Sequence, residues 1–123
     1  MQPYERFEAW QFAHKLNLAT HRITVSWPVA ERYGLTAQVR RCAFSVVANM
    51  VEGSAKRGRR EFARFLDISI GSLAELSYAF RFAREVGYLA EEEANALEAL
   101  RESTARLTHR LYQAVSGRCR RDP

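Results

Sequence analysis

The segment Arg59–Val86 has the sequence RREFARFLDISIGSLAELSYAFRFAREV. Its large apolar residues recur at spacings of three and four, which places them on one face of an α-helix. The residues predicted to face the core are Phe62, Phe65, Leu66, Ser69, Leu73, Leu76, Phe80 and Ala83. Gly87 follows, and glycine favours the left-handed conformation that ends many helices. The segment therefore predicts one long amphipathic helix.

Two segments on the N-terminal side show the same periodicity. The first helix is predicted over Tyr4–Ser26 and ends before Trp27-Pro28, because proline pushes the preceding residue out of the helical region. Its predicted inward residues are Ala9, Phe12, Leu16, Ala19 and Ile23, and Trp10 and Ala13 widen this stripe. The second helix is predicted to begin at Thr36, whose hydroxyl suits an N-cap. Its pattern loses definition at Gly53-Ser54, and Gly58 is predicted to be its end. Its predicted inward residues are Val39, Ala43, Val46 and Met50.

A fourth helix is predicted to begin near Ala90 and to end at Gly117. Glu91, Glu92 and Glu93 fall in its first turn, where the helix dipole favours negative charge. Its predicted seam is Leu97, Leu100, Thr104, Leu107, Leu111 and Val115. Four amphipathic helices with short connections predict an all-α fold, an antiparallel up-down four-helix bundle over residues 1–117. A basic tail, 118–123, follows it.

The composition is that of one folded domain. The chain has 123 residues, of which 47% are apolar and 27% charged, and its apolar runs are far shorter than the roughly 20 residues needed to span a bilayer. The N-terminus lacks the pattern of a signal peptide, so a cytoplasmic protein is expected. Cys42 and Cys119 are predicted to be a small core residue and an exposed thiol, without a disulfide.

The motifs of common enzyme classes are missing from the sequence. No His is preceded by Glu at the third position before it, as a di-iron bundle requires, and no H-E-x-x-H motif, phosphate-binding glycine loop or G-x-S-x-G motif occurs. His14 and His21 are seven residues apart and are interpreted as surface or interface residues rather than metal ligands. We therefore predict no catalytic residue, no metal and no cofactor.

The third helix carries more apolar residues than one core face needs. With a rotation of about 100° per residue, four apolar residues lie on the side of this helix opposite Phe62. They are Ile68, Tyr78, Phe82 and Val86. Together with Trp10 they are predicted to form an interface between identical chains, because large exposed apolar patches usually mark interfaces. The alternative is that some of them are simply exposed.

A polar pair interrupts the apolar second helix. Asn49 and Glu52 are three residues apart and share a helix face. They are interpreted as part of a buried hydrogen-bond network with Ser72 or Glu75, and a functional polar site is the alternative. Gly71 is then predicted to be the small residue that lets the helices approach closely.

The net charge of +5 is concentrated in a few places. The main group of cations lies within nine residues, and the same stretch contains one acid, Glu61. Its members are Lys56, Arg57, Arg59, Arg60 and Arg64. Arg40 and Arg41 lie about 24 Å away along the second helix and form a separate pair. Adjacent arginines suit phosphate oxygens, so these seven residues are the candidate nucleic-acid contacts. Arg40 and Arg41 alternatively form salt bridges between subunits.

Several motifs resemble one protein family. Residues 31–41, ERYGLTAQVRR, resemble its E-x-Y-G-L-T-x-Q-[IL]-R-R segment, and Ser45 with 49–53, NMVEG, resembles S-I-x-x-N-I-A-E-G. Residues 71–75, GSLAE, and 85–89, EVGYL, match G-S-x-x-E and L-G-Y-L. The family is that of the 23S rRNA intervening-sequence protein. Val46, Val47 and Val51 depart from it, standing where the family tends to have isoleucine, proline and alanine.

This resemblance implies an antiparallel up-down bundle that assembles as a ring-shaped homopentamer. Some family members are encoded inside insertions in bacterial 23S rRNA genes. A related protein, the accessory variability determinant of diversity-generating retroelements, binds nucleic acid and a reverse transcriptase. Five copies of a +5 chain would carry about +25, which concentrates charge that attracts phosphate.

The sequence thus supports a non-enzymatic cytoplasmic homo-oligomer that binds RNA or DNA, with ribosomal RNA as one candidate. Contacts to phosphate would give affinity with little sequence specificity. The alternative is a protein-interaction scaffold that presents its aromatic and charged faces to a protein partner and has no role in nucleic-acid binding. An interaction with membranes is not expected.

Overall fold

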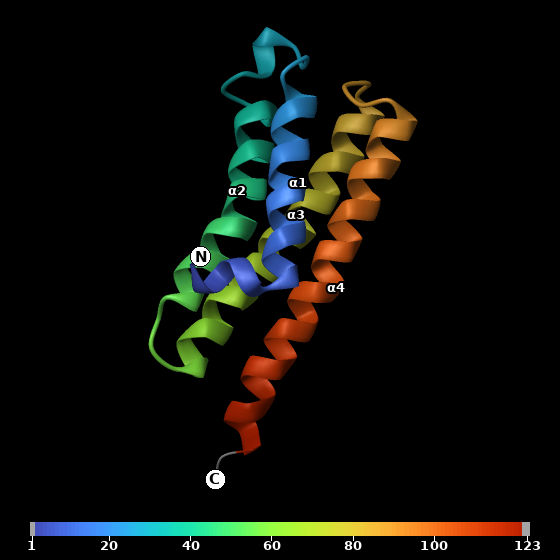
Figure 1. Ribbon diagram of the computed structural model, residues 1–123. Coiled ribbons are helices and arrows are strands. Elements are labelled where there is room, and N and C mark those ends of the chain that lie inside the picture. Colours follow the sequence, from blue (N-terminus) through green and yellow to red (C-terminus); the bar gives the residue numbers. More distant parts are fainter. Residues whose placement is uncertain (1, 122–123) are drawn as a thin grey trace.

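A computed structural model describes residues 2–121 of the chain, and side chains as far as residue 117. The elements are η1 (Pro3–Arg6), α1 (Glu8–Thr24), η2 (Val29–Glu31), α2 (Leu35–Ser54), α3 (Arg59–Glu85) and α4 (Glu91–Arg121). Figure 1 shows four long helices side by side with alternating directions. Helices and turns account for all of the described secondary structure, which confirms the predicted four-helix bundle.

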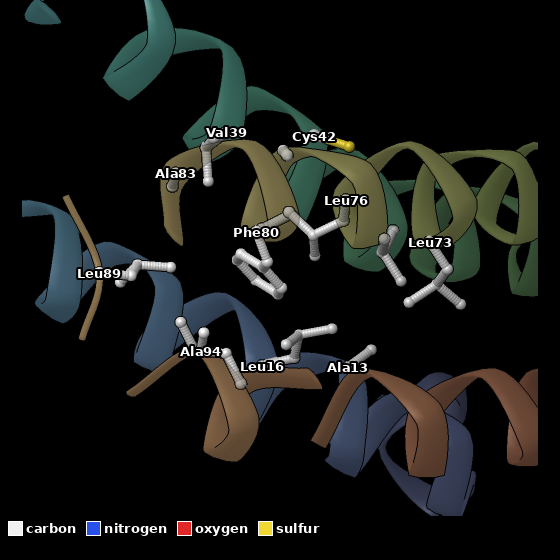
Figure 2. Close-up of a cluster of buried hydrophobic side chains, with 14 of the residues drawn as sticks. Ala13, Leu16, Val39, Cys42, Leu73, Leu76, Phe80, Ala83, Leu89 and Ala94 are labelled. Atoms are coloured by element: carbon white, nitrogen blue, oxygen red, sulfur yellow. The ribbon is translucent and has the colours of Figure 1, made fainter. Parts of the chain in front are cut away.

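Each long helix packs against two neighbours: α1 against α2 and α4, and α3 against α2 and α4. Apolar side chains from all four helices meet along the centre of the bundle (Figure 2). Phe80, Leu16, Met50, Leu66, Leu73 and Leu76 are the largest fully buried side chains, and each is 2% exposed or less. All four residues predicted to point inward from α2 are buried, as are all those predicted in α3 except the half-buried Phe62.

The predicted first helix is interrupted at Phe7. This residue has extended backbone angles, so the preceding 3-10 turn η1 is separate from α1 and lies across the lower end of the bundle (Figure 1). The ring of Phe7 packs on Phe62 of α3, with centroids 5.6 Å apart. The N-terminal segment therefore covers the end of the bundle where α2 meets α3.

The core face of α1 is rotated from the one predicted. Its buried residues are Ala9, Ala13, Leu16, Thr20 and Thr24, whereas Phe12, Ala19 and Ile23 are half-buried. Two of the buried residues are threonines, which the hydrophobic pattern did not select. Their Oγ1 atoms donate to the carbonyl oxygens of Leu16 and Thr20 at 2.8 and 2.9 Å. This bond within the helix satisfies the hydroxyl, so threonine can occupy a core position.

The start of α2 also differs from the prediction. The N-cap is Gly34 rather than Thr36, whose Oγ1 is buried and has no hydrogen-bond partner among the described atoms. The free N–H of Leu35 instead donates to Oε1 of Glu31 at 3.1 Å. A carboxylate four residues upstream thus supplies the cap that the sequence assigned to a threonine hydroxyl.

The close approach between α2 and α3 occurs at Gly53. A Cβ added there would lie 2.7 Å from Cβ of Phe65, so this position requires glycine. Gly71 was predicted to have this role, and that prediction is wrong because a Cβ at Gly71 would meet no atom within 4 Å. Helix α2 ends at Ser54, four residues before the predicted end at Gly58.

The two turns on either side of α3 each use a glycine with positive φ. Gly58 precedes α3 and Gly87 follows it, both with φ of 89°, a conformation that other residues rarely adopt. Helix α4 begins at Glu91 with three glutamates in its first turn, as predicted, but continues to Arg121 beyond the predicted end at Gly117. Side chains of the proposed basic tail, Cys119 included, lie outside the described ones.

Candidate functional site

The largest group of cations surrounds the turn between α2 and α3. Lys56 and Arg57 lie in the turn, and Arg59, Arg60 and Arg64 lie in the first two turns of α3. All five side chains are exposed. This turn is at the same end of the bundle as η1 and the C-terminal end of α4 (Figure 1). We call Lys56, Arg57, Arg59, Arg60 and Arg64 the basic end.

Two members of the basic end have partners within the chain. The guanidinium of Arg64 donates from Nη2 to Oε2 of Glu61 at 3.0 Å and lies 4.6 Å from the ring centroid of Phe65. Nζ of Lys56 is 4.0 Å from Oε1 of Glu52 and 5.6 Å from the same ring. The hydrogen bond from Arg64 holds the pKa of the Glu61 carboxyl below its usual value, so this acid stays ionised.

The remaining three arginines have unoccupied guanidinium groups. Arg57, Arg59 and Arg60 make no ion pair or side-chain hydrogen bond with the residues described. Gly58 lies between Arg57 and Arg59, has positive φ and precedes the first residue of α3. Each of these three planar guanidinium groups can donate two hydrogen bonds to two oxygen atoms of one phosphate.

The second pair of candidate contacts, Arg40 and Arg41, has a different role within the subunit. Nε of Arg40 donates to Oγ1 of Thr24 at 2.8 Å, and its Nη2 donates to the carbonyl oxygen of His21 at 3.2 Å. Arg40 therefore holds α2 against the C-terminal end of α1, where a cation also complements the helix dipole. Arg41 is exposed and donates from Nη2 to Oε1 of Gln38 at 2.8 Å.

The predicted polar network is present only in part. Oγ of Ser45 and Oγ of Ser72 are 2.9 Å apart, and Nδ2 of Asn49 donates to Ser45 Oγ at 3.0 Å. Asn49 and Ser72 thus belong to one half-buried network that links α2 to α3. The two acids lie outside it: Glu52 pairs with Lys56, and Glu75 accepts from Nε2 of Gln38 at 2.7 Å.

Ser45, which bonds within this network, and the neighbouring Gln38 and Cys42 were not among the predicted residues. Sγ of Cys42 donates to the carbonyl oxygen of Ser72 at 3.0 Å, and burial, reinforced by the charge of Glu75, raises the pKa of this thiol to about 12. Cys42 is therefore a protonated core residue, as predicted. The spacing of Ser45, four residues before Asn49, could have indicated its place in the network.

The predicted apolar interface residues differ in exposure. Ile68, Tyr78, Phe82 and Val86 on α3 are 41%, 66%, 41% and 46% exposed. Trp10 is half-buried instead, because its ring stacks on His14 at 5.1 Å and contacts Tyr4 at 5.0 Å. Trp10 thus uses much of its aromatic surface inside its own subunit, whereas the α3 residues leave theirs uncovered.

Among the described residues, no group of three or more His, Cys, Asp or Glu side chains is arranged to hold a metal ion. No described helix is long and apolar enough to cross a membrane.

These features define a class: an up-down four-helix bundle with a cationic turn at one end and an uncovered apolar stripe on α3. The family model of the 23S rRNA-intervening sequence protein matches residues 5–110, and the chain belongs to this family. No curated protein matches the sequence.

One solved structure confirms the fold. It is a protein of unknown function from the S23 ribosomal protein family of Bacteroides thetaiotaomicron. The two structures superpose with a TM-score of 0.77 at 14% sequence identity, over 85% of this chain and 95% of the other.

Proposed function

We propose that the protein is a non-enzymatic homo-oligomer, in the form of a pentamer, that binds nucleic acid through the basic end. The observation that carries this proposal is the set of three exposed guanidinium groups on one turn, Arg57, Arg59 and Arg60, which the subunit itself does not use. The family's description names 23S rRNA, so structured RNA is the first ligand to test.

The candidate residues differ in the bonds that they make within the subunit. Arg57, Arg59 and Arg60 are the principal phosphate contacts, because binding them breaks no bond within the chain. Arg64 and Lys56 contribute charge but must share it with Glu61 and Glu52. Arg40 belongs to the packing of α2 on α1, and we no longer assign it a phosphate contact.

The test compares two triple variants that remove the same charge. The basic-end variant carries Gln in place of Arg57, Arg59 and Arg60. The control variant carries Gln in place of three exposed arginines elsewhere, Arg22, Arg32 and Arg84. Binding of a fluorescent RNA hairpin and of a DNA duplex is measured by anisotropy between about 50 and 200 mM salt, the range over which phosphate contacts lose most affinity. For the DNA duplex, each phosphate contact that a subunit loses should reduce the slope of log affinity against log salt concentration by about 0.9.

The proposal predicts a large loss of slope for the basic-end variant and little change for the control. Equal loss in both variants would mean that only the total charge matters, and no binding by the wild type at low salt would refute a nucleic-acid role. Glu61→Gln provides a change of the opposite sign. It releases the guanidinium of Arg64 and removes an acid, so it should tighten binding.

A further inference from the structure

Gly71 has a position in α3 that its own subunit does not explain. It lies in the middle of a 27-residue helix, is exposed, and has open space where a Cβ would be. Glycine in a helix interior is less stable than alanine, so a glycine is expected where another group must come close. At Gly53 that group is Phe65 of the same chain, at 2.7 Å. At Gly71 no described atom of the chain has this role.

The residues around Gly71 form a continuous outward surface. At 100° per residue, six of the residues between positions 67 and 82 of α3 fall within one arc of about 100°. These six, which we call the α3 face, are Asp67, Ile68, Gly71, Glu75, Tyr78 and Phe82. Its apolar members are 41–66% exposed, and its charged members are both acids. No Lys or Arg occurs between Arg64 and Arg81, so the centre of this face is acidic as well as apolar.

A second surface of the same chain has the complementary character. A groove between α1 and α2, which we call the α1–α2 groove, is lined by Asn17, Leu18, His21, Ala37, Arg40, Arg41 and Phe44. Phe44 is 62% and Leu18 38% exposed, so apolar side chains of both helices face solvent along this groove. The lining contains two arginines and no acid.

We propose that the α3 face of one copy packs into the α1–α2 groove of the next copy, with Gly71 at the point of closest approach. This inference rests on the self-association in the proposed function and names its interface. Tyr78 and Phe82 would cover Phe44 and Leu18, and Glu75 would lie near Arg41. Because the two surfaces differ, the contact is head-to-tail, the type that closes into a ring when the rotation permits.

Two single variants each damage one side of this contact. Gly71→Gln adds a side chain at the closest point, and the open space around Gly71 means that the isolated subunit should still fold. Phe44→Glu places an acid opposite the acidic α3 face and changes an exposed position. Ala96→Gln, at an exposed position of α4, is the matched control. Size is measured by light scattering after gel filtration, and folding by circular dichroism.

We expect Ala96→Gln to retain the wild-type oligomer and the two interface variants to be folded monomers. An equimolar mixture of the two monomers should then form a dimer and nothing larger, because Gly71→Gln keeps its groove and Phe44→Glu keeps its α3 face. A mixture that stays monomeric would mean that the two variants do not damage opposite sides of one contact. That result would overturn the proposed interface, as would an intact oligomer in either single variant.

The same series separates this inference from the proposed function. A wild-type protein that is monomeric at micromolar concentration would refute both self-association and the interface. An oligomeric wild type whose size is unchanged by Gly71→Gln would refute the interface alone. RNA binding by the Gly71→Gln monomer should weaken through loss of multivalency but keep its dependence on Arg57, Arg59 and Arg60.

Discussion

The two ends of the bundle are built in different ways. At one end, Glu31 bonds to both connections: its Oε1 accepts from the N–H of Leu35, and its Oε2 accepts from the hydroxyl of Tyr88 at 2.9 Å. Trp27 is buried beside Tyr88, with ring centroids 5.8 Å apart. We call this the closed end. At the other, basic end, a four-residue turn carries exposed cations that make few contacts with the subunit.

This difference indicates how the chain divides stability and binding. The closed end joins the α1–α2 and α3–α4 connections by an aromatic contact and by a carboxylate that two groups share. The basic end keeps its guanidinium groups exposed, where they add little to folding and remain available to a polyanion. Substitutions at the closed end should therefore change stability, and those at the basic end should change binding.

Trp27→Ala should have the largest effect on stability. The side chain is 6% exposed, and truncating a buried aromatic residue costs about 3–5 kcal/mol. The triple change of Arg57, Arg59 and Arg60 to Gln should alter the free energy of unfolding by less than about 0.5 kcal/mol. Urea denaturation of both variants measures the contrast. Similar losses at the two ends would contradict the division just described.

Glu31→Ala should have the next largest effect. It removes the cap on the N–H of Leu35, and loss of a helix cap costs about 0.5–2 kcal/mol. Glu31→Gln retains an acceptor oxygen and should recover part of the loss. The measurement is thermal unfolding followed by circular dichroism, with Glu92→Ala, an exposed acid on α4, as the control. Equal melting temperatures for the Ala variant and the wild type would exclude the capping role.

Gly58→Ala and Gly87→Ala form a matched pair, one at each end. Both residues have φ of 89°, where a Cβ costs about 1–2 kcal/mol, and neither has an atom within 4 Å of the added Cβ. The two losses of stability should therefore be similar. A much larger loss at Gly87 would show that the closed end also depends on its backbone, which would sharpen the contrast between the ends.

Tyr88 should give the smallest effect, visible only at alkaline pH. The hydrogen bond to Glu31 raises the pKa of the tyrosine hydroxyl above its usual value of about 10. Its contribution to stability is therefore complete below pH 10 and is lost as the pH rises through the raised pKa. The difference in melting temperature between wild type and Tyr88→Phe should shrink from pH 9 to pH 11. A constant difference would mean that the hydroxyl is not coupled to Glu31.

The hydrophobic pattern predicted the number, type and order of the helices, because apolar spacing in α2 and α3 matches their buried faces. It failed on α1, where Thr20 and Thr24 replace larger residues in the core and satisfy their hydroxyls locally. It also misplaced the cap of α2. The cap is the carboxylate of Glu31, which reaches the N–H of Leu35 because of the way the connection folds. Contacts of that kind are invisible to local periodicity.

The candidate site was predicted to a similar degree. The charge run alone identified the basic end, because five cations within nine residues must lie near one another. It did not separate Arg57, Arg59 and Arg60 from Arg40, whose partners Thr24 and His21 belong to another helix. The meaning of Gly71 also required the structure, since the sequence does not tell whether the neighbour of a small residue lies inside or outside the chain.

The polar groups of the interior also determine how the molecule comes apart. Between α2 and α3 they bond across the helices: Ser69 Oγ donates to the carbonyl oxygen of Val46 at 2.8 Å, and Cys42 to that of Ser72. In α4, the hydroxyls of Thr104 and Thr108 instead bond to carbonyls of their own helix. A partial opening that releases α4 breaks none of these threonine bonds and loses the half-buried bond from Ser77 Oγ to Glu98 Oε1, which is 3.0 Å long. The amide protons of α4 should therefore exchange with solvent before those of α2 and α3. The pair α2 and α3 is then expected to be the last part to unfold.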